Sequence, residues 1–527
     1  MPNNQANINT KSYIDFIEEI SAEDLYEGLL GYGLFTDRLP PVFTSISFLN
    51  YCNQNTPTFS GKVNGFISHR SMRNIGVPRA MGIPTPMKYQ QLCTLLKTNW
   101  PKIIDHFRDN TKNQKYRISR IHIRKQYNSK RLFEMNYKNW HFDGNPEIDL
   151  LIQTTGACRF LIHADISTCF PSIYTHSIPW ALVGKSKAKQ LKSPKNKSEW
   201  FNQIDHACQA MKSGETHGLL IGPHASNLLS EIILVAVDHK LCEKYTYIRN
   251  IDDYECFVKS HEEAQLFLRD LEEQLKEFDL VLNHKKTKIT TLPVENDQLW
   301  KNKLNAALVA NNKGFIEYQK VNNYIDMTLS IAKELSNFAV ARYAIKTLAG
   351  MPLTPNARKL ATKRFMHMAI LYPYLLSVMD EFVFAPYKPE IDDIKELANS
   401  IIIDAERVND YESMCFAIYF ALKYDFRIHI YDLDHAEKYI SKQKDCIFLI
   451  MSWLYYSKNF TKDSSLLSIF IGAATTFIND DEMDRYWLFC YETLPLTSLP
   501  NEWKEMKRKE VSFIKPEFLI SHKDKIS

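Results

Sequence analysis

The stretch Tyr247-Ile-Arg-Asn-Ile-Asp-Asp-Tyr-Glu-Cys-Phe257 places two adjacent aspartates, Asp252 and Asp253, between two apolar, β-prone segments. β-Branched and aromatic residues on both sides favour strands, and Asp-Asp is common in the turn of a hairpin on a wet surface. A tight turn also holds the two carboxylates close together, where they repel each other. A divalent metal ion would neutralise them, so the stretch is compatible with a solvated turn or with a metal site.

A third carboxylate lies upstream of this hairpin. The segment Arg159–Asp165 is predicted to be a strand from its β-branched and aromatic content, and it ends in Asp165. If this strand is a neighbour of the hairpin, three carboxylates meet in one oxygen-rich site that suits two Mg²⁺ ions about 4 Å apart. Together the three aspartates favour a metal-dependent nucleotidyl-transfer site over a solvated turn.

Two further segments fit such a site. Gly222-Pro223 stands directly before a helix expected over Ala225–Cys242, and a Gly-Pro turn there lets a nucleotide approach the backbone closely. Downstream, the loop Leu282–Thr287 carries Lys286, which could neutralise or protonate a departing pyrophosphate. Taken alone, Lys286 is equally well an ordinary exposed loop lysine.

The overall composition is that of an ordinary globular protein. The chain has 527 residues, 45% hydrophobic and 24% charged, which is enough for two to four domains with normal cores. The net charge of +4 does not by itself indicate a nucleic-acid partner. Lysine and arginine gather in Lys97–Arg131 and in Gly184–Lys197, and for each stretch a phosphate-rich partner and a solvated face remain open.

Cysteine usage and apolar runs predict a reduced, soluble, cytoplasmic protein. The ten cysteines are dispersed without a Cys-x-x-Cys pair, which argues against a zinc module and a disulfide framework. The N-terminus lacks the basic-then-apolar order of a secretory signal. The apolar runs Cys446–Tyr456 and Leu466–Ile478 fall short of the roughly 20 residues of a membrane helix.

The pattern along the chain predicts an α+β protein in three parts. Residues 1–60 carry helical periodicity that breaks at Gly31-Tyr-Gly33. Residues 61–300 alternate short strands with helices. Residues 301–527 are predicted to form successive amphipathic helices, stacked as HEAT-like hairpins. The aromatic clusters Trp453–Tyr456 and Tyr486–Phe489 in the last part are expected to be core rather than a surface for single-stranded DNA.

The order of these motifs resembles the palm of reverse transcriptases. Asp-x-x-x-x-Phe at Asp165–Phe170 is followed by Gly-Pro-x-x-Ser, by the apolar-Asp-Asp hairpin and by Leu-Asn-x-x-Lys-Thr. Upstream, Arg79–Pro86 is similar to the basic, proline-containing segment of their fingers. The resemblance covers roughly residues 70–290. Phe170–Trp180 and the lysine-rich Gly184–Lys197 are similar to the bacterial abortive-infection (Abi) polymerases, with the prophage-encoded branch as the best fit.

The resemblance implies roles for individual residues. Asp165, Asp252 and Asp253 would bind two Mg²⁺ ions, with Mn²⁺ as a substitute and the Ile166 carbonyl as an extra ligand. Phe170 would block a ribose 2′-hydroxyl, so that deoxynucleotides are preferred. The remaining nucleotide contacts would be Gly222, Pro223 and Lys286, with Arg120 or Arg124 gripping the triphosphate.

The sequence departs from the common reverse-transcriptase pattern in two places. Asn250 stands where an aromatic residue usually supports the primer end, and Glu215–Gly218 replaces the usual Gln-Gly. Abi polymerases are known for template-independent synthesis that starts on a tyrosine, and Tyr32 between two glycines is the candidate primer, although a packed aromatic in a helix break explains it as well.

The resemblance therefore implies an anti-phage DNA polymerase. Its substrates would be dNTPs, its product single-stranded DNA, and its assembly a homo-oligomer, a trimer or a hexamer, without membrane contact. Two alternatives stay open: a conventional RNA-templated reverse transcriptase, and a catalytically dead palm that serves as a scaffold for a phage or host protein.

Overall fold

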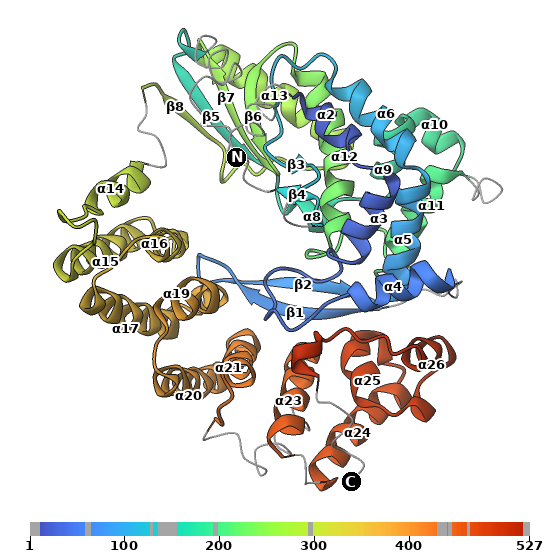
Figure 1. Cartoon of the computed structure of the whole chain (residues 1–527). Helices are drawn as coiled ribbons and strands as arrows, with labels where there is room; N and C mark the ends of the chain where they lie inside the picture. Colours follow the sequence, from blue (N-terminus) through green and yellow to red (C-terminus); the bar gives the residue numbers. More distant parts are fainter. Residues whose placement is uncertain are drawn as a thin grey trace. The chain divides into compact units, whose positions relative to one another are not determined.

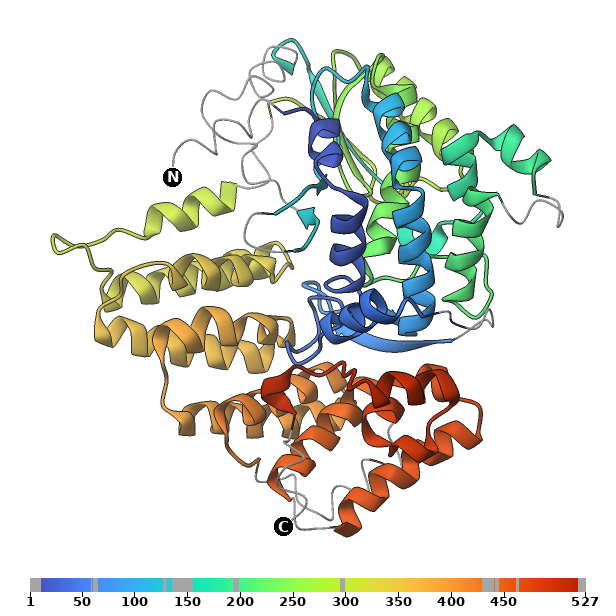
Figure 2. The same cartoon turned by 45° about the vertical axis from the view of Figure 1, so that its right-hand side comes forward.

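The computed structural model describes residues 11–57, 59, 65–126, 130–134, 155–192, 199–293, 299–428, 440, 445–460 and 464–519. Figures 1 and 2 show the chain in two views. Contacts divide it into two compact units. The first consists of Met1–Thr36, Ser45–Phe66 and Gly82–Val294, and the second of Asp37–Thr44, Ile67–Met81 and Glu295–Ser527. The sequence ranges 1–60, 61–300 and 301–527 stay a prediction of domain boundaries.

The first unit combines a four-stranded antiparallel sheet with helices. Its elements are α2 (Tyr13–Glu18), α3 (Ala22–Leu30), α4 (Ile46–Asn55), α5 (Pro86–Thr98), α6 (Trp100–Thr111), β3 (His122–Ile123), β4 (Phe133–Glu134), β5 (Phe160–Asp165), α8 (Cys169–Ser172), α9 (Ser177–Val183), α10 (Lys185–Gln190), α11 (Trp200–Ala210), α12 (His224–Leu241), β6 (Thr246–Asn250), β7 (Asp253–Val258), α13 (His261–Lys276) and β8 (Lys288–Thr291). The strand order is β6-β7-β5-β8. The predicted strand before Asp165, the hairpin and the helix after Pro223 are confirmed.

Buried and more exposed side chains alternate along the strands β6 and β7, as expected for a sheet that packs on one face. In β7 every second residue is buried, beginning at Tyr254, and the fully buried side of β6 carries Tyr247. Helix α13 contacts β5 and β7 and contributes Phe267 and Leu271, which are both completely buried. Because successive strand residues point to opposite faces, this pattern fixes which face of the hairpin packs on the helices (Figure 1).

The second unit is helical apart from most of the hairpin β1 (Phe66–Met72) and β2 (Pro78–Pro84). Its helices are α14 (Leu299–Ala307), α15 (Tyr318–Glu334), α16 (Ala339–Ala349), α17 (Pro355–Leu371), α18 (Leu376–Met379), α19 (Ala385–Tyr387), α20 (Ile391–Val408), α21 (Tyr411–Tyr424), α23 (Cys446–Asn459), α24 (Ser464–Asn479), α25 (Trp487–Thr493) and α26 (Asn501–Arg508). The predicted change to helices after residue 300 is confirmed, while HEAT-like stacking stays a prediction.

Buried polar contacts join the β1–β2 hairpin to the helices of its own unit. His69 Nδ1 lies 2.9 Å from an Asp445 carboxylate oxygen, and Ser71 Oγ donates to Glu412 at 2.6 Å. All four side chains are buried. Arg79, predicted to lie in a fingers segment, is an exposed residue of β2.

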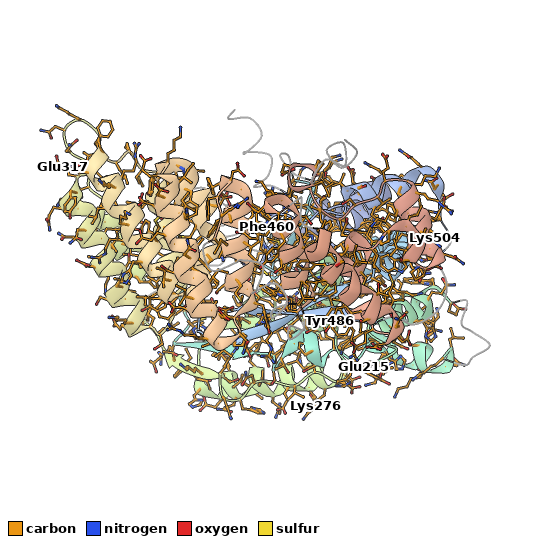
Figure 3. The ribbon with its side chains drawn as sticks, turned by 90° about the horizontal axis from the view of Figure 1, so that it is seen from below. Glu215, Lys276, Glu317, Phe460, Tyr486 and Lys504 are labelled. Atoms are coloured by element: carbon orange, nitrogen blue, oxygen red, sulfur yellow. The ribbon has the colours of Figure 1, made fainter. Side chains whose placement is uncertain are left out.

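The aromatic clusters of the second unit are core, as predicted. Tyr455, Tyr456 and Trp487 are completely buried. Tyr486, labelled in Figure 3, stacks on Phe477 with ring centroids 3.8 Å apart. Within the described residues, no helix combines the length and apolar character needed to cross a bilayer.

Candidate active site

Strand pairing brings the three predicted carboxylates to one edge of the sheet. β5 and β7 are antiparallel, with Asp165 directly opposite Asp253. Such partners have Cα atoms about 4.5–5.5 Å apart. Asp252 lies in the two-residue turn between β6 and β7, and its carbonyl accepts a hydrogen bond from the Ile166 N–H at 3.0 Å. The aspartates, separated by more than 80 residues of chain, are therefore neighbours.

The turn itself has an unusual backbone. Ile251, its first residue, has a φ of +59°. Two-residue hairpin loops require a positive φ, which is usually supplied by glycine or asparagine, and a β-branched residue in that region is strained. The Arg249 guanidinium donates to the Ile251 carbonyl at 3.0 Å. A tertiary contact thus supports a turn that the local sequence does not favour.

Lys286 and Asn283 hold the Asp165 carboxylate. Lys286 Nζ lies 2.6 Å from Asp165 Oδ2, and Asn283 Nδ2 donates to Oδ1 at 2.9 Å. The Asn283 backbone N–H also donates to the Asp165 carbonyl at 2.7 Å, which fixes the loop against the end of β5. The hydrogen bond to Asp165 raises the pKa of Lys286, so the lysine is a cation beside the carboxylates. The role of Lys286 at a pyrophosphate stays a prediction, and its direct contact with Asp165 was not foreseen from the sequence.

Asp253 is electrostatically strained. Partial desolvation and then the negative charge of Asp252 raise its pKa to about 7, with a hydrogen bond to Asp165 acting in the same direction. Lys286 opposes this shift. Burial and nearby negative charge both disfavour the ionised form of a carboxyl group, so this site favours a bound proton or cation.

The donors suit a divalent cation by their chemistry. Carboxylate oxygens are the ligands that Mg²⁺ prefers, and the raised pKa of Asp253 is the repulsion that a cation would relieve. Among the residues that the structure describes, however, no group of three or more His, Cys, Asp or Glu is already arranged around a metal position. Asp165 is engaged by Lys286 and Asn283 instead, so metal binding would require Lys286 to release Oδ2.

The Gly222-Pro223 segment leads into α12, as the sequence predicts. Gly222 has a φ of +132°, a conformation that favours glycine, and Pro223 is the N-cap residue. The N–H of His224 donates to the Gly33 carbonyl at 2.8 Å, and the Ala225 N–H to the Tyr89 hydroxyl at 3.3 Å. These first helical N–H groups are already satisfied, so a nucleotide would meet the Gly222 backbone rather than the helix terminus.

The other predicted nucleotide contacts have different environments. Phe170 is a half-buried residue of α8, and its carbonyl accepts from the Leu219 N–H at 2.8 Å, which ties α8 to the segment before Gly222. Arg120 is buried, and its backbone N–H donates to the Arg249 carbonyl. Arg124 is half-buried, with its guanidinium 5.9 Å from the Phe16 ring centroid. Of the lysine-rich stretch, residues 193–197 lie outside the described residues.

Tyr32 is half-buried in the Gly31–Gly33 loop. Both glycines are required by packing, since a Cβ at Gly33 would lie 2.7 Å from His224 Cβ and one at Gly31 would lie 2.8 Å from Leu49 Cδ2. The loop carrying Tyr32 therefore packs directly on the start of α12. The phenols of Tyr13 and Tyr26, by contrast, are buried, and burial raises the pKa of Tyr26 to about 12.

Sequence reasoning assigned no role to Arg249, although it lies within the quoted hairpin. It is completely buried and forms ion pairs with Glu231 and Asp238 of α12. A signal was present, because Arg249 occupies the same face of β6 as Tyr247. A charged residue on the buried face of a strand is rare unless it is paired.

The part of the chain that carries the three aspartates matches the model of a known protein family. Residues 105–324 match the family model described as reverse transcriptase (RNA-dependent DNA polymerase). The chain contains a reverse transcriptase domain. The match covers less than half of the chain and includes all three aspartates, Arg120, Arg124, Phe170, the Gly222-Pro223 segment and Lys286, but not Tyr32. The coarser prediction, a reverse transcriptase domain within the chain, is confirmed.

Distant structural similarities were found among solved proteins, while no curated protein matched the chain. The apo telomerase of Candida tropicalis truncated from its C-terminal domain is 13% identical, with a TM-score of 0.29 over 47% of this chain and 55% of that one. The apo telomerase of Candida tropicalis is 10% identical, with a TM-score of 0.31 over 80% and 71%. Telomerase from Candida albicans in complex with a telomeric RNA fragment is 10% identical, with a TM-score of 0.29 over 85% of this chain and 69% of that one. The chain thus spans about half the length of the first of these structures.

Proposed function

We propose that this chain is a DNA polymerase that joins deoxynucleotides without a template and starts the DNA on a tyrosine of its own. The observation that carries the catalytic part is the pairing of Asp165 with Asp253 across β5 and β7, with Asp252 in the adjoining turn. The reverse transcriptase domain match over the same residues supports it. The absence of a template and the tyrosine primer rest on the resemblance to Abi polymerases.

The proposed site would take two Mg²⁺ ions, or Mn²⁺ in their place. Asp165, Asp252 and Asp253 would hold them, with the Ile166 carbonyl as a further ligand. Bound ions of this kind lower the pKa of an attacking hydroxyl and stabilise the charge that develops on the transferred phosphoryl group. The raised pKa of Asp253 supports this assignment, because burial and then the neighbouring carboxylates disfavour its ionised form, which a bound cation would favour.

The protein's own residues would bind and orient the nucleotide. Lys286, once released from Asp165, would face the pyrophosphate and balance its charge. The Gly222 and Pro223 backbone would line the nucleotide position, and Phe170 would exclude a 2′-hydroxyl by its bulk. Arg120 or Arg124 would contact the triphosphate; Arg124 is the better placed of the two for a ligand, because Arg120 is buried.

Tyr32 is the proposed primer. It is half-exposed, whereas Tyr13 and Tyr26 are buried in the same unit. Its loop packs against His224, one residue after the proposed nucleotide contact Pro223. The packing of its loop on the start of α12 supports the choice of Tyr32.

The test is synthesis by purified protein with dNTPs and Mg²⁺ as the only additions. We expect an increase in the intact mass of the protein that nuclease removes. Asp252→Ala with Asp253→Ala should abolish it, while Glu273→Ala, an exposed acid on α13, should leave it unchanged. Undiminished synthesis by the double variant would refute the metal-site assignment, and loss of product in Tyr26→Phe but not in Tyr32→Phe would refute the primer assignment.

A conventional RNA-templated reverse transcriptase is the second candidate. The family description, RNA-dependent DNA polymerase, favours it. Asn250, an exposed residue at the end of β6 where an aromatic residue usually supports the primer, disfavours it. Product that copies an added RNA would decide for this candidate. A third outcome, no synthesis under any condition, would favour a scaffold that binds a phage or host protein.

The cellular role is also a proposal. We expect a cytoplasmic homo-oligomer, a trimer or a hexamer, that acts in abortive infection against phage. Phage resistance that disappears with Asp165→Ala would support the role, and intact resistance in that strain would contradict it.

A further inference from the structure

Arg249 stands at the centre of a buried ionic cluster beside the paired aspartates. Its Nε and Nη2 donate to Asp238 Oδ2 at 2.8 and 2.7 Å. Its Nη1 and Nη2 donate to the two Glu231 oxygens at 3.0 and 3.1 Å. All three side chains are completely buried. Both acids belong to α12, so the arginine joins β6 to that helix.

The positive charge of Arg249 is balanced by the two carboxylates of this cluster. Two carboxylates face one guanidinium, and two tyrosine hydroxyls complete the set, with Tyr13 donating to Glu231 at 2.8 Å and Tyr247 to Asp238 at 3.1 Å. Burying such a group costs several kcal/mol of desolvation per ion, and apolar residues often stabilise a fold as well or better. Stability alone is therefore a weak reason for an ionic cluster at this position.

The remaining hydrogen bond of the guanidinium reaches the turn. Arg249 Nη1 donates to the Ile251 carbonyl at 3.0 Å, and Ile251 is the residue with the strained φ of +59° directly before Asp252. Both backbone groups of Arg249 bond to the segment Ile118–Arg120. Its N–H donates to the Ile118 carbonyl at 2.9 Å, and its carbonyl accepts from the Arg120 N–H at 2.7 Å. The arginine is thus a fixed point from which one hydrogen bond sets the conformation of the turn.

The same cluster connects the two halves of the proposed site. α12 begins directly after Gly222 and Pro223, the proposed nucleotide contacts, and carries both acids that bind the guanidinium. The turn carries Asp252 and Asp253. Arg249 bonds to α12 and to the turn at once, so it links the helix that follows the proposed nucleotide contacts to the turn that carries the carboxylates.

We infer that Arg249 is a positioning residue, which holds the Ile251–Asp253 turn in the conformation that binds the divalent cation. The inference rests on the proposed function. Its action differs from that of Lys286. The lysine contacts a carboxylate with its charge, whereas the arginine holds the backbone of the turn through the Ile251 carbonyl. Lysine is no substitute, because a single ammonium does not reproduce the planar fork that meets two carboxylates and a carbonyl.

The test separates positioning from stability with two variants, and Arg249→Met alone serves as the reference for stability. Arg249→Lys keeps the charge but loses the fork. In the triple variant Arg249→Met, Glu231→Gln and Asp238→Asn, no charge is left to be buried unpaired, acceptors for Tyr13 and Tyr247 remain, and the bond to Ile251 is lost. Two properties are measured for each: the thermal midpoint, and binding of Mn²⁺ followed by the electron paramagnetic resonance signal of the free ion.

Both variants are expected to bind Mn²⁺ about 10-fold or more weakly, and to need correspondingly more Mg²⁺ for half-maximal DNA synthesis. Ile204→Ala, on α11 and completely buried, is the control for destabilisation, since α11 packs against α5 and α9. It should lower the thermal midpoint without changing Mn²⁺ affinity. The triple variant should be more stable than Arg249→Met alone and still bind Mn²⁺ weakly.

Mn²⁺ affinity that recovers together with stability in the triple variant would overturn the positioning role, as would unchanged affinity in Arg249→Lys. The double variant Asp252→Ala and Asp253→Ala distinguishes this failure from failure of the proposed function. If it binds Mn²⁺ as wild type does, the metal site itself is wrong; if it loses the metal while the Arg249 variants keep it, only the positioning role is wrong.

Discussion

Replacing Lys286 by methionine should tighten metal binding and weaken synthesis at the same time. Lys286 Nζ lies 2.6 Å from Asp165 Oδ2, where it competes with a cation for that oxygen. Coulomb's law with an effective dielectric constant near 20 gives about 6 kcal/mol for such a pair. The lysine side chain is 64% exposed, however, so solvent screening reduces the interaction to about 1 kcal/mol or less. Removal of this competitor corresponds to Mn²⁺ binding that is tighter by up to about fivefold.

The assay is Mn²⁺ titration without nucleotide at pH 8. At this pH the Asp253 carboxyl, with a pKa of about 7, is mostly ionised and protons compete little. Lys285→Met is the matched control, because Lys285 is the exposed neighbour and removes the same charge. DNA synthesis should fall in Lys286→Met and persist in Lys285→Met, since only Lys286 is proposed to face the pyrophosphate. Equal Mn²⁺ affinities in the two variants would refute the reasoning.

Three further predictions concern other parts of the first unit. Gly33→Ala should lower the free energy of unfolding by about 1–3 kcal/mol, because its Cβ would lie 2.7 Å from His224 Cβ, whereas Gly350→Ala, with its nearest atom at 3.7 Å, should cost far less in the same urea titration. Burial lowers the pKa of His106 to about 4, so its contribution to stability is complete above about pH 6.5 and is lost as the pH falls toward 4. The free energy of unfolding should therefore fall between pH 7 and pH 5 by about 2 kcal/mol more in wild type than in His106→Gln. Phe170→Ala should raise incorporation of ribonucleotides relative to deoxynucleotides in a competition assay, and an unchanged ratio would remove Phe170 from the sugar contact.

Local sequence patterns were sufficient for the elements that carry the site. β-Branched and aromatic residues predicted the hairpin around Asp252 and the strand ending at Asp165, because such side chains favour extended backbone. The Gly222-Pro223 start of α12 followed from backbone restrictions that act within a few residues. Motif order then predicted the reverse transcriptase domain. These signals lie within short segments or in the order of segments along the chain, so they do not depend on how distant segments pack.

The sequence by itself determined which residues are candidates for the chemistry and which strands present them. The tertiary structure alone decided the contacts between distant segments. Lys286 bonds to Asp165, Gly33 packs against His224, and Arg249 bonds to both α12 and the strained turn. No local pattern encodes these contacts, since each joins segments whose distance in space depends on the packing of the whole unit. The raised pKa of Asp253 has the same origin, because it depends on how near Asp252 and Asp165 come and how much water remains between them.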